Sequence, residues 1–146
     1  MPRPPRSFEP GGFYHVTARG NNGRVIVTDD EDRTAFVTLL ARIPVRFGIN
    51  IHAWCLMTNH YHLVIETPSG QVSRAVQYLN SSHARRFNRR HGREGHLFRA
   101  RFRATVIVDE RHLEAACAYV LLNPVRAGLT ATADDWRWAG AVGSPA

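Results

Sequence analysis

Four segments of the chain arrange their apolar residues in the way that predicts β-strands. Residues 13–18 alternate strictly between two faces, with phenylalanine, histidine and threonine on one and tyrosine, valine and alanine on the other. Residues 49–57 and 61–67 predict two more strands, and residues 58–59 between them are few enough to form a tight hairpin. Residues 102–108 predict a fourth strand, so we expect a four-stranded sheet.

A first helix is expected between the first two strands. Thr28 and Glu31 have the spacing of a capping box, which predicts that the helix opens there. Its apolar positions recur with helical spacing and fall on one face; they are Phe36, Leu39, Leu40 and Ile43. Pro44 and Gly48 are expected to mark its end.

Two further segments carry helical periodicity. Residues 71–91 predict a long helix with an apolar stripe near its start and a basic C-terminal half. Asp109 is expected to cap a last helix, which should run to about Asn123 because Pro124 cannot continue it.

The order of these elements is strand, helix, strand, strand, helix, strand and a final helix. This is the split pattern of a ferredoxin-like α+β sandwich, with an antiparallel sheet and one appended C-terminal helix. We expect residues 1–146 to form a single domain, with residues 1–12 as a flexible basic arm and residues 134–140 folding back on the body. Helices cover one face of such a sheet, and the other face is free to carry a site.

The charge of the chain predicts a polyanionic partner. Its formal net charge is +7, its pI is near 10.6, and every one of its 19 basic residues is an arginine. A GC-rich genome would explain the preference for arginine over lysine equally well, but not the clustering of the arginines. Between Arg74 and Arg103 a single acidic residue, Glu94, accompanies the arginines. These arginines are residues 74, 85, 86, 89, 90, 93, 99, 101 and 103.

Several classes of protein are disfavoured by composition. No segment approaches the roughly 18 uninterrupted apolar residues of a membrane helix. The basic N-terminus has no apolar run behind it, so it does not have the pattern of a secretory signal, and we expect a cytoplasmic protein. Cys55 and Cys117 lie in apolar contexts without metal-ligand spacing, and we interpret both as reduced core residues.

His60 and His62 form the first candidate site. Residues two apart on a strand point to the same face, so both imidazoles would come within reach of one metal ion, while Tyr61 points to the opposite, packed face. From spacing alone, a pair of half-exposed histidines without a metal is the favoured interpretation.

Tyr119 and Asn123 form the second candidate pair. They are four residues apart and would stack on one face of the last helix, close to its end. Asn123 would then complete a metal site with Tyr119 as a nucleophile beside it. The alternative is that Tyr119 simply packs in the core with a satisfied hydroxyl.

Taken together, these motifs resemble the REP-associated tyrosine transposases, of the insertion-sequence-200-like single-tyrosine transposases in the HUH endonuclease superfamily. The resemblance covers nearly the whole chain in order and spacing. Its motifs are Phe13-Tyr14-His15-Val16-Thr17 with Arg19-Gly20-Asn21, Met57-Thr58-Asn59-His60-Tyr61-His62, Gly95-His96-Leu97-Phe98 with Arg101-Phe102, Tyr119 to Leu129, and Trp136 to Gly140.

The resemblance implies an enzyme that cuts and rejoins single-stranded DNA, with Tyr119 as nucleophile and a 5′-phosphotyrosine intermediate. It implies a divalent cation, Mg²⁺ or Mn²⁺, held by His60 and His62, with Asn123 as third ligand by its position one turn after the tyrosine. The chain departs from the family pattern at Tyr61, where a plain hydrophobe is usual, and strand alternation argues against Tyr61 as nucleophile.

The resemblance also implies single-stranded or hairpin DNA as partner, and a monomer or a homodimer as assembly. The residues we expect to bind DNA are Arg3, Arg6, Arg85, Arg86, Arg89, Arg90, Arg99, Arg101 and Arg103. A solvated basic face without a specific ligand is the alternative for these arginines. Three other functions stay open: a domesticated DNA-binding protein without catalysis, an HUH replication initiator or relaxase, and an RNA-binding ferredoxin-like module.

Overall fold

The computed structural model of the chain describes residues 8–141 and contains one five-stranded antiparallel sheet. The order of the strands is β4-β1-β3-β2-β5. Their bounds are Gly12–Arg19 for β1, Asn50–Leu56 for β2, His60–Thr67 for β3, Arg103–Ile107 for β4 and Ala139–Gly140 for β5. The first four strands have the order and the antiparallel pairing of the expected ferredoxin-like α+β sandwich, which is therefore confirmed.

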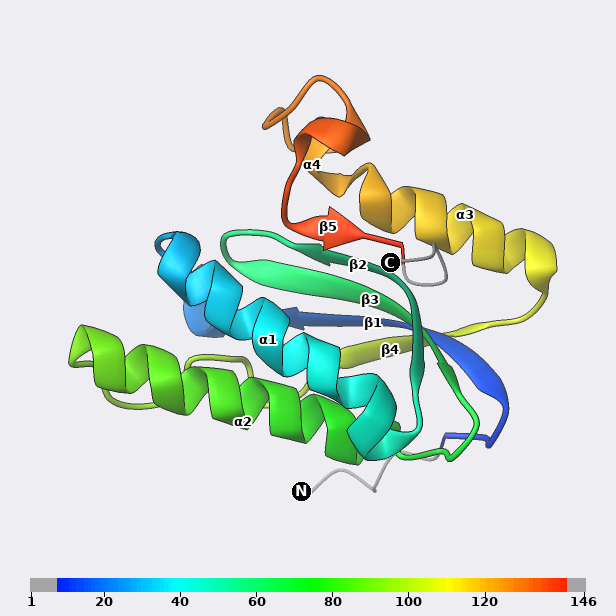
Figure 1. Cartoon of the computed structure of the whole chain (residues 1–146), viewed down its shortest axis with the longest axis horizontal. Helices are drawn as coiled ribbons and strands as arrows, with labels where there is room; N and C mark the ends of the chain where they lie inside the picture. The colour runs from blue at the N-terminus through cyan, green and yellow to red at the C-terminus, as the bar shows by residue number, and fades with distance from the viewer. Residues whose placement is uncertain (1–7, 142–146) are drawn as a thin grey trace.

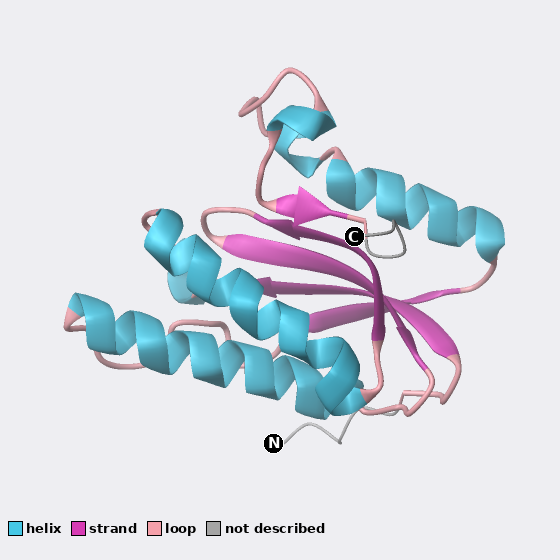
Figure 2. Ribbon diagram, viewed as in Figure 1, coloured by secondary structure: helices cyan, strands magenta, loops and turns pink. Residues whose placement is uncertain are grey.

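The helices lie on both faces of the sheet (Figures 1 and 2). The long helices α1, Asp30–Phe47, and α2, Val72–His91, cover one face, and α3, Glu110–Leu121, lies over the other. The short helix α4, Asn123–Arg126, follows α3 directly. Alternation along β1 fits this arrangement, because Tyr14, Val16 and Ala18 belong to the core under α1 and α2.

The C-terminal segment forms the fifth strand, which was not expected. Trp136 donates its indole N–H to the carbonyl of Leu56, and the amide of Leu56 donates to the carbonyl of Trp138. Ala139 and Gly140 then pair with β2. The prediction that residues 134–140 fold back on the body is confirmed, and the pairing shields what would otherwise be an edge strand.

The start of α1 differs from the expected capping box. Asp29, not Thr28, is the N-cap, and its carboxylate accepts a hydrogen bond from the amide of Asp32. Thr28 instead donates both its amide and its hydroxyl to the carboxylate of Asp32. The capping residue was thus placed one position early. Four successive acidic residues follow Thr28, and three of them lie in the first turn, where acidic residues are favoured.

The ends of two helices also differ in detail. Pro44 lies inside the last turn of α1, and Gly48 ends that helix in the left-handed conformation at φ 61°. The last helix was expected to run to about Asn123, and α3 ends two residues earlier, at Leu121. Pro124 instead occupies the first turn of α4, where its missing N–H costs nothing.

The N-terminal arm was expected to include residues 1–12, and its first seven residues, with Arg3 and Arg6, lie outside the described residues. In the described remainder, the ring of Phe8 packs against Tyr14 and Phe102, with centroids 4.9 and 6.3 Å apart. Between residues 8 and 141, no helix has the length and apolar composition needed to span a membrane.

Candidate active site

The candidate residues meet on the face of the sheet that lies under α3. His15 and Thr17 of β1 point to this face, and in the antiparallel register Thr17 lies opposite His62 of β3. His60 follows two residues before His62, and the two imidazole centroids are 5.0 Å apart. Strand alternation therefore brings together the two predicted histidines and two side chains from a neighbouring strand.

The buried imidazole of His62 is held on both sides of its ring. Its Nδ1 lies 3.0 Å from Nε2 of His15 and 3.2 Å from Oγ1 of Thr17. Its Nε2 lies 2.8 Å from the side-chain nitrogen of Asn123. An amide nitrogen can only donate, so Nε2 of His62 is the accepting nitrogen and Nδ1 carries the proton.

His60 shows the same arrangement. Its Nδ1 lies 2.7 Å from Oδ1 of Asn59, which can only accept, so this nitrogen also carries the proton. The lone pair of His60 is then on Nε2, as in His62. In both residues a partner on the far side of the ring fixes the tautomer that places the lone pair on Nε2, the atom that would bind a cation.

Asn123 reaches this site from the start of α4, not from α3 as expected. Besides His62, its amide also hydrogen-bonds His60, which works to raise the pKa of that imidazole. Leu122 separates the two helices, so Asn123 is the first residue of α4, and the adjacent Pro124 is buried. The predicted trio of His60, His62 and Asn123 is therefore in mutual contact.

Tyr119 stands beside the trio on α3. Its ring centroid lies 6.0 Å from that of His62 and 5.8 Å from that of His15, both edge-on. The side chain is 49% exposed, so it is accessible from outside in spite of these contacts. The alternative that Tyr119 is buried in the core is wrong.

Arg126 of α4 holds the tyrosine from the solvent side. Its guanidinium carbon lies 3.9 Å from the centre of the Tyr119 ring, and its Nη2 donates to the Tyr119 carbonyl at 2.5 Å. That carbonyl is in the last turn of α3, where backbone carbonyls have no amide donor within the helix. Arg126 therefore fixes both the backbone and the ring of Tyr119.

The site opens into a cleft of about 440 Å³. Its walls include the Tyr119 ring, two imidazoles in addition to that of His62, and two arginines, one from β1 and one from β4. The lining residues are His15, Thr17, Arg19, His62, Arg103, Thr105, His112, Ala115, Ala116 and Tyr119. No carboxylate is among them, so the cleft suits an anionic ligand.

Burial and positive charge keep these histidines neutral. Burial lowers the pKa of His62 to about 3, assisted by the charges of His60, His15, Arg19 and Arg126. Burial also lowers the pKa of His60, assisted by Arg19, and that of His15, assisted by His112. Neutral imidazole is the form that binds metals, so the site is prepared for a cation at neutral pH.

The donor set fits a divalent cation with open coordination positions. No group of three or more histidine, cysteine, aspartate or glutamate side chains suited to a metal exists among residues 8–141. A site here would therefore consist of two imidazole nitrogens and the amide oxygen of Asn123. The amide would have to rotate, because its nitrogen faces His62 in this structure. Such a mixed set suits Mn²⁺ or Mg²⁺ and leaves positions for other oxygens.

Tyr61 is excluded from the site, as expected. It is fully buried on the α1 and α2 side, where its hydroxyl donates to Oδ1 of Asn80 at 2.6 Å. Burial raises the pKa of its phenol. The cysteines are free, with Cys55 buried and Cys117 partly buried, and burial raises the pKa of Cys55 to about 12.

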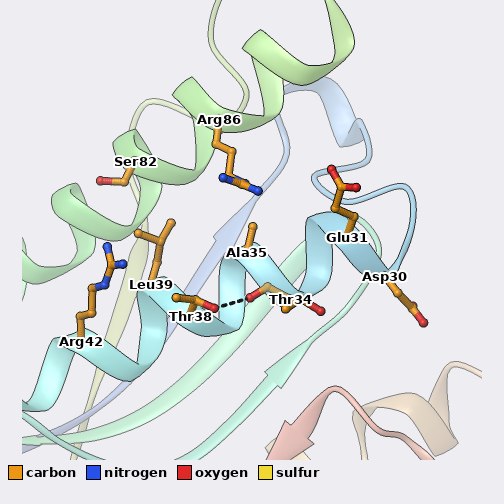
Figure 3. A pocket seen from close by; sticks show the side chains of 9 residues that line it. All are labelled: Asp30, Glu31, Thr34, Ala35, Thr38, Leu39, Arg42, Ser82 and Arg86. Carbon is orange, nitrogen blue, oxygen red and sulfur yellow. Dashed lines mark hydrogen bonds between the residues drawn. The ribbon is translucent and has the colours of Figure 1, made fainter.

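The predicted DNA-binding arginines do not form one patch. Arg103 lines the cleft, whereas Arg85, Arg99 and Arg101 line a separate groove along α2. Arg86 extends from α2 towards α1, into a third hollow that also contains Asp30 and Glu31 (Figure 3). Arg89 is exposed on α2.

Arg90 differs from the others, because it is held by carboxylates. It forms ion pairs with Asp29, Glu31 and Asp32 at 2.6 to 2.8 Å. Burial works to raise the pKa of Asp32, but hydrogen bonds from Arg90, Thr28 and His91 outweigh it and lower the pKa. Arg90 thus ties the end of α2 to the start of α1.

Four residues of the site were not expected from the sequence: His15, Thr17, Asn59 and Arg126. The alternation of residues 13–18 had already put His15 and Thr17 on one face, but only the pairing of β1 with β3 brings them to His62. Arg126 lay within the motif after Tyr119 without an assigned role.

The chain is similar to known proteins in sequence and in fold. Residues 11–122 match the family model described as transposase, IS200-like. A Haemophilus influenzae protein named as a REP-associated tyrosine transposase is 26% identical over 145 residues, covering 90% of this chain and 80% of its own length.

Two solved structures share the fold. The structure of a REP-associated tyrosine transposase bound to a REP hairpin matches with a TM-score of 0.76 and 18% identity, over 95% of this chain and 82% of its own. A protein named as a transposase from Deinococcus radiodurans R1 matches with a TM-score of 0.55 and 18% identity, over 81% of this chain and 95% of its own.

Proposed function

The chain belongs to the IS200-like transposase family, and from that premise we propose that it is a metal-dependent strand transferase of the REP-associated tyrosine type. Its substrate is single-stranded DNA that carries a hairpin. The observation that carries the proposal is that Tyr119 and Asn123 both contact His62, although the three residues come from three elements.

His60, His62 and Asn123 would hold a Mg²⁺ or Mn²⁺ ion. When bound, the ion would polarise the scissile phosphate and offset the negative charge that grows on its non-bridging oxygens. His15 and Thr17 keep the proton of His62 on Nδ1, and Asn59 does the same for His60. Arg19 and Arg103 attract the phosphate to the cleft.

Tyr119 supplies the nucleophile in this proposal. Its phenolic oxygen attacks phosphorus and forms a 5′-phosphotyrosine bond, while the bond from phosphorus to the 3′-oxygen breaks. The phenolic proton goes to solvent, and the departing 3′-oxygen takes up a proton to become a hydroxyl. Attack by a 3′-hydroxyl on the phosphotyrosine reverses the step, so neither water nor ATP is consumed. Arg126 holds Tyr119 in place for both directions.

Arginines without carboxylate partners would bind the flanking DNA. Arg85, Arg99, Arg101 and Arg103 line hollows that contain no acidic residue. We leave Arg90 out of the DNA-binding set because three carboxylates neutralise it. Affinity for DNA should fall steeply with salt if phosphates are the main contacts.

The test is to incubate the protein with end-labelled hairpin DNA from the flanks of its own gene, with Mn²⁺, and to analyse the products on a denaturing gel. Wild type should form a metal-dependent covalent protein–DNA band. Tyr119→Phe should lose the band while it still binds the hairpin, because only the hydroxyl is removed. Tyr78→Phe is the matched control, since this tyrosine packs on Phe47 of α1, and it should keep the band.

Binding without any covalent band in the wild type, with several flanking hairpins and with both metals, would instead favour a DNA-binding protein without catalysis. A covalent band that persists in Tyr119→Phe would show that another residue is the nucleophile.

A further inference from the structure

A second large hollow, here called the α2 groove, lies on the opposite face of the sheet from Tyr119. It has a volume of about 920 Å³ and runs between α2 and the segment that leads into β4. Its lining consists of Ser73, Val76, Gln77, Asn80, Ser81, Ala84, Arg85, Asn88, Gly95, His96, Leu97, Phe98, Arg99, Ala100, Arg101 and Phe102. The chemical steps proposed above do not use it, and of its residues only Arg85, Arg99 and Arg101 have been given a role, in binding the flanking DNA.

The charge of the α2 groove has one sign. Arg85, Arg99 and Arg101 line it, and no acidic residue does. None of these three arginines forms an ion pair with a carboxylate in the part of the chain that the structure describes. The hollow between α1 and α2 is different, because Asp30 and Glu31 accompany its arginines (Figure 3). Of these two hollows, the α2 groove is therefore the one suited to a chain of phosphates.

The lining of the α2 groove also suits bases. Val76, Leu97 and Phe98 provide buried apolar surface, and amide side chains stand among them. Asn80 is held in one orientation, because its oxygen accepts the hydroxyl hydrogen of buried Tyr61 at 2.6 Å. Its N–H₂ end is then left as a donor, and within residues 8–141 it has no hydrogen-bond partner. An unpaired base can place the acceptors on its edge against such a fixed donor and its ring against the apolar surface.

The α2 groove is connected to the cleft around the edge of the sheet. Arg99 of the groove lies next to Arg19 of the cleft, since the amide of Arg99 donates to the Arg19 carbonyl at 2.9 Å. Four residues later, Arg103 pairs with Thr17 and lines the cleft. A line of arginines thus leads from one face of the sheet to the other past the start of β4.

We propose that the α2 groove binds unpaired nucleotides of the DNA strand whose phosphate is cut in the cleft, with Arg85 and Arg101 on phosphates and Asn80 on a base edge. This inference rests on the proposed function and adds a subsite to it. Tyr61, which departs from the family pattern, acts as a positioning residue by orienting Asn80.

The test compares two labelled probes in the Tyr119→Phe background without metal. One is a blunt hairpin, and the other is the same hairpin with ten-nucleotide single-stranded extensions at both ends. Wild-type residues in the groove should make the extended probe bind at least tenfold more tightly by fluorescence anisotropy. Arg85→Ala combined with Arg101→Ala should remove most of that gain and change the affinity for the blunt probe less than twofold.

Arg86→Ala is the matched control, since it removes the same charge from the next position on α2 but faces the other hollow. It should reduce the gain less than twofold. Asn80→Leu should leave the average affinity for random extensions nearly unchanged and reduce the discrimination among extension sequences. Equal binding of both probes, or equal losses for Arg85 and Arg86 variants, would overturn the inference while leaving strand transfer intact.

A crosslinking experiment makes the result independent of the variants. Extensions that carry 5-iodouracil at single positions should crosslink, under ultraviolet light, to peptides from residues 97–102 or from α2. Crosslinks confined to α3 and α4 would rule out the groove. Failure of the protein to bind either probe would overturn the proposed function and this inference with it.

Discussion

On the side of the sheet covered by α1 and α2, β1 presents Tyr14 and Val16, and its neighbours there are apolar side chains from both helices. On the side covered by α3, the same strand presents His15 and Thr17 to His62. On the first face, one apolar residue can be replaced by another of similar size, because this face stabilises the fold through the apolar area that it buries. On the second face, the proposed chemistry depends on hydrogen bonds between particular atoms, such as those from His15 and Thr17 to His62. The comparison indicates that stability and chemistry are divided between the two faces.

The largest effect should come from a cavity in the first face. Phe36 is fully buried against Tyr61 and His83, with ring centroids 5.1 and 5.3 Å away. Phe36→Ala should lower the free energy of unfolding by about 3–5 kcal/mol, because it removes a large buried ring and leaves a cavity. Urea unfolding followed by circular dichroism measures this change. Val45→Ala on the same helix is the control, since Val45 is 93% exposed, and it should stay within about 0.5 kcal/mol.

The difference between the apolar face and the face that carries the site also explains how much of the fold the sequence could predict. The alternation in residues 13–18 and the spacing of Phe36, Leu40 and Ile43 report burial directly, so β1 and α1 followed from them. The point where α3 gives way to α4 did not follow, because proline is forbidden inside a helix but favoured in its first turn. Local pattern alone cannot decide between these two outcomes.

The site was predictable only in part, for a related reason. His60, His62, Tyr119 and Asn123 lie within recognisable motifs, and their contacts agree with the prediction that they form one site. Asn59 is adjacent to His60, but its role depends on the direction of a side chain in a hairpin. The arginines were treated as one patch because they are close in sequence, whereas burial and acidic partners distribute them among several surfaces.

A smaller and more specific effect should come from the second face. His15→Phe keeps a ring of similar shape next to His62 and Tyr119 but removes the nitrogen that accepts the His62 proton. If His62 binds the metal, Mn²⁺ affinity should fall about tenfold, and about 100-fold when Thr17→Val also removes the second acceptor. Isothermal titration calorimetry with Mn²⁺ measures the affinity directly.

His52→Phe is the control for this pair, because it removes a histidine of β2 that pairs with Glu66 and not with His62. It should change Mn²⁺ affinity less than twofold. Unchanged Mn²⁺ affinity in the double variant would mean that the Nδ1 partners do not support metal binding, and the division between the two faces would lose its basis.

The smallest effect concerns a titratable group that lies within the apolar face. His83 of α2 is buried among Phe36, Phe87 and Phe98, and its Nε2 donates to the Ile26 carbonyl at 2.7 Å. Burial lowers its pKa and outweighs the hydrogen bond to Ile26 and the charge of Asp32, while Arg86 acts in the same direction as burial.

Because the pKa of His83 is lower in the folded protein, the unfolded chain takes up a proton first as the pH falls below its ordinary value of about 6.5. The contribution of neutral His83 to stability is therefore complete above that pH and is lost progressively below it. His83→Gln keeps a donor for Ile26 but does not titrate, so its unfolding free energy should depend less steeply on pH between 7.5 and 5.5. Urea unfolding across that range tests this, with exposed His96→Gln expected to keep the wild-type slope. Identical slopes for wild type and His83→Gln would mean that even this buried histidine takes up its proton in the folded state, and the apolar face would then tolerate charge that its packing should exclude.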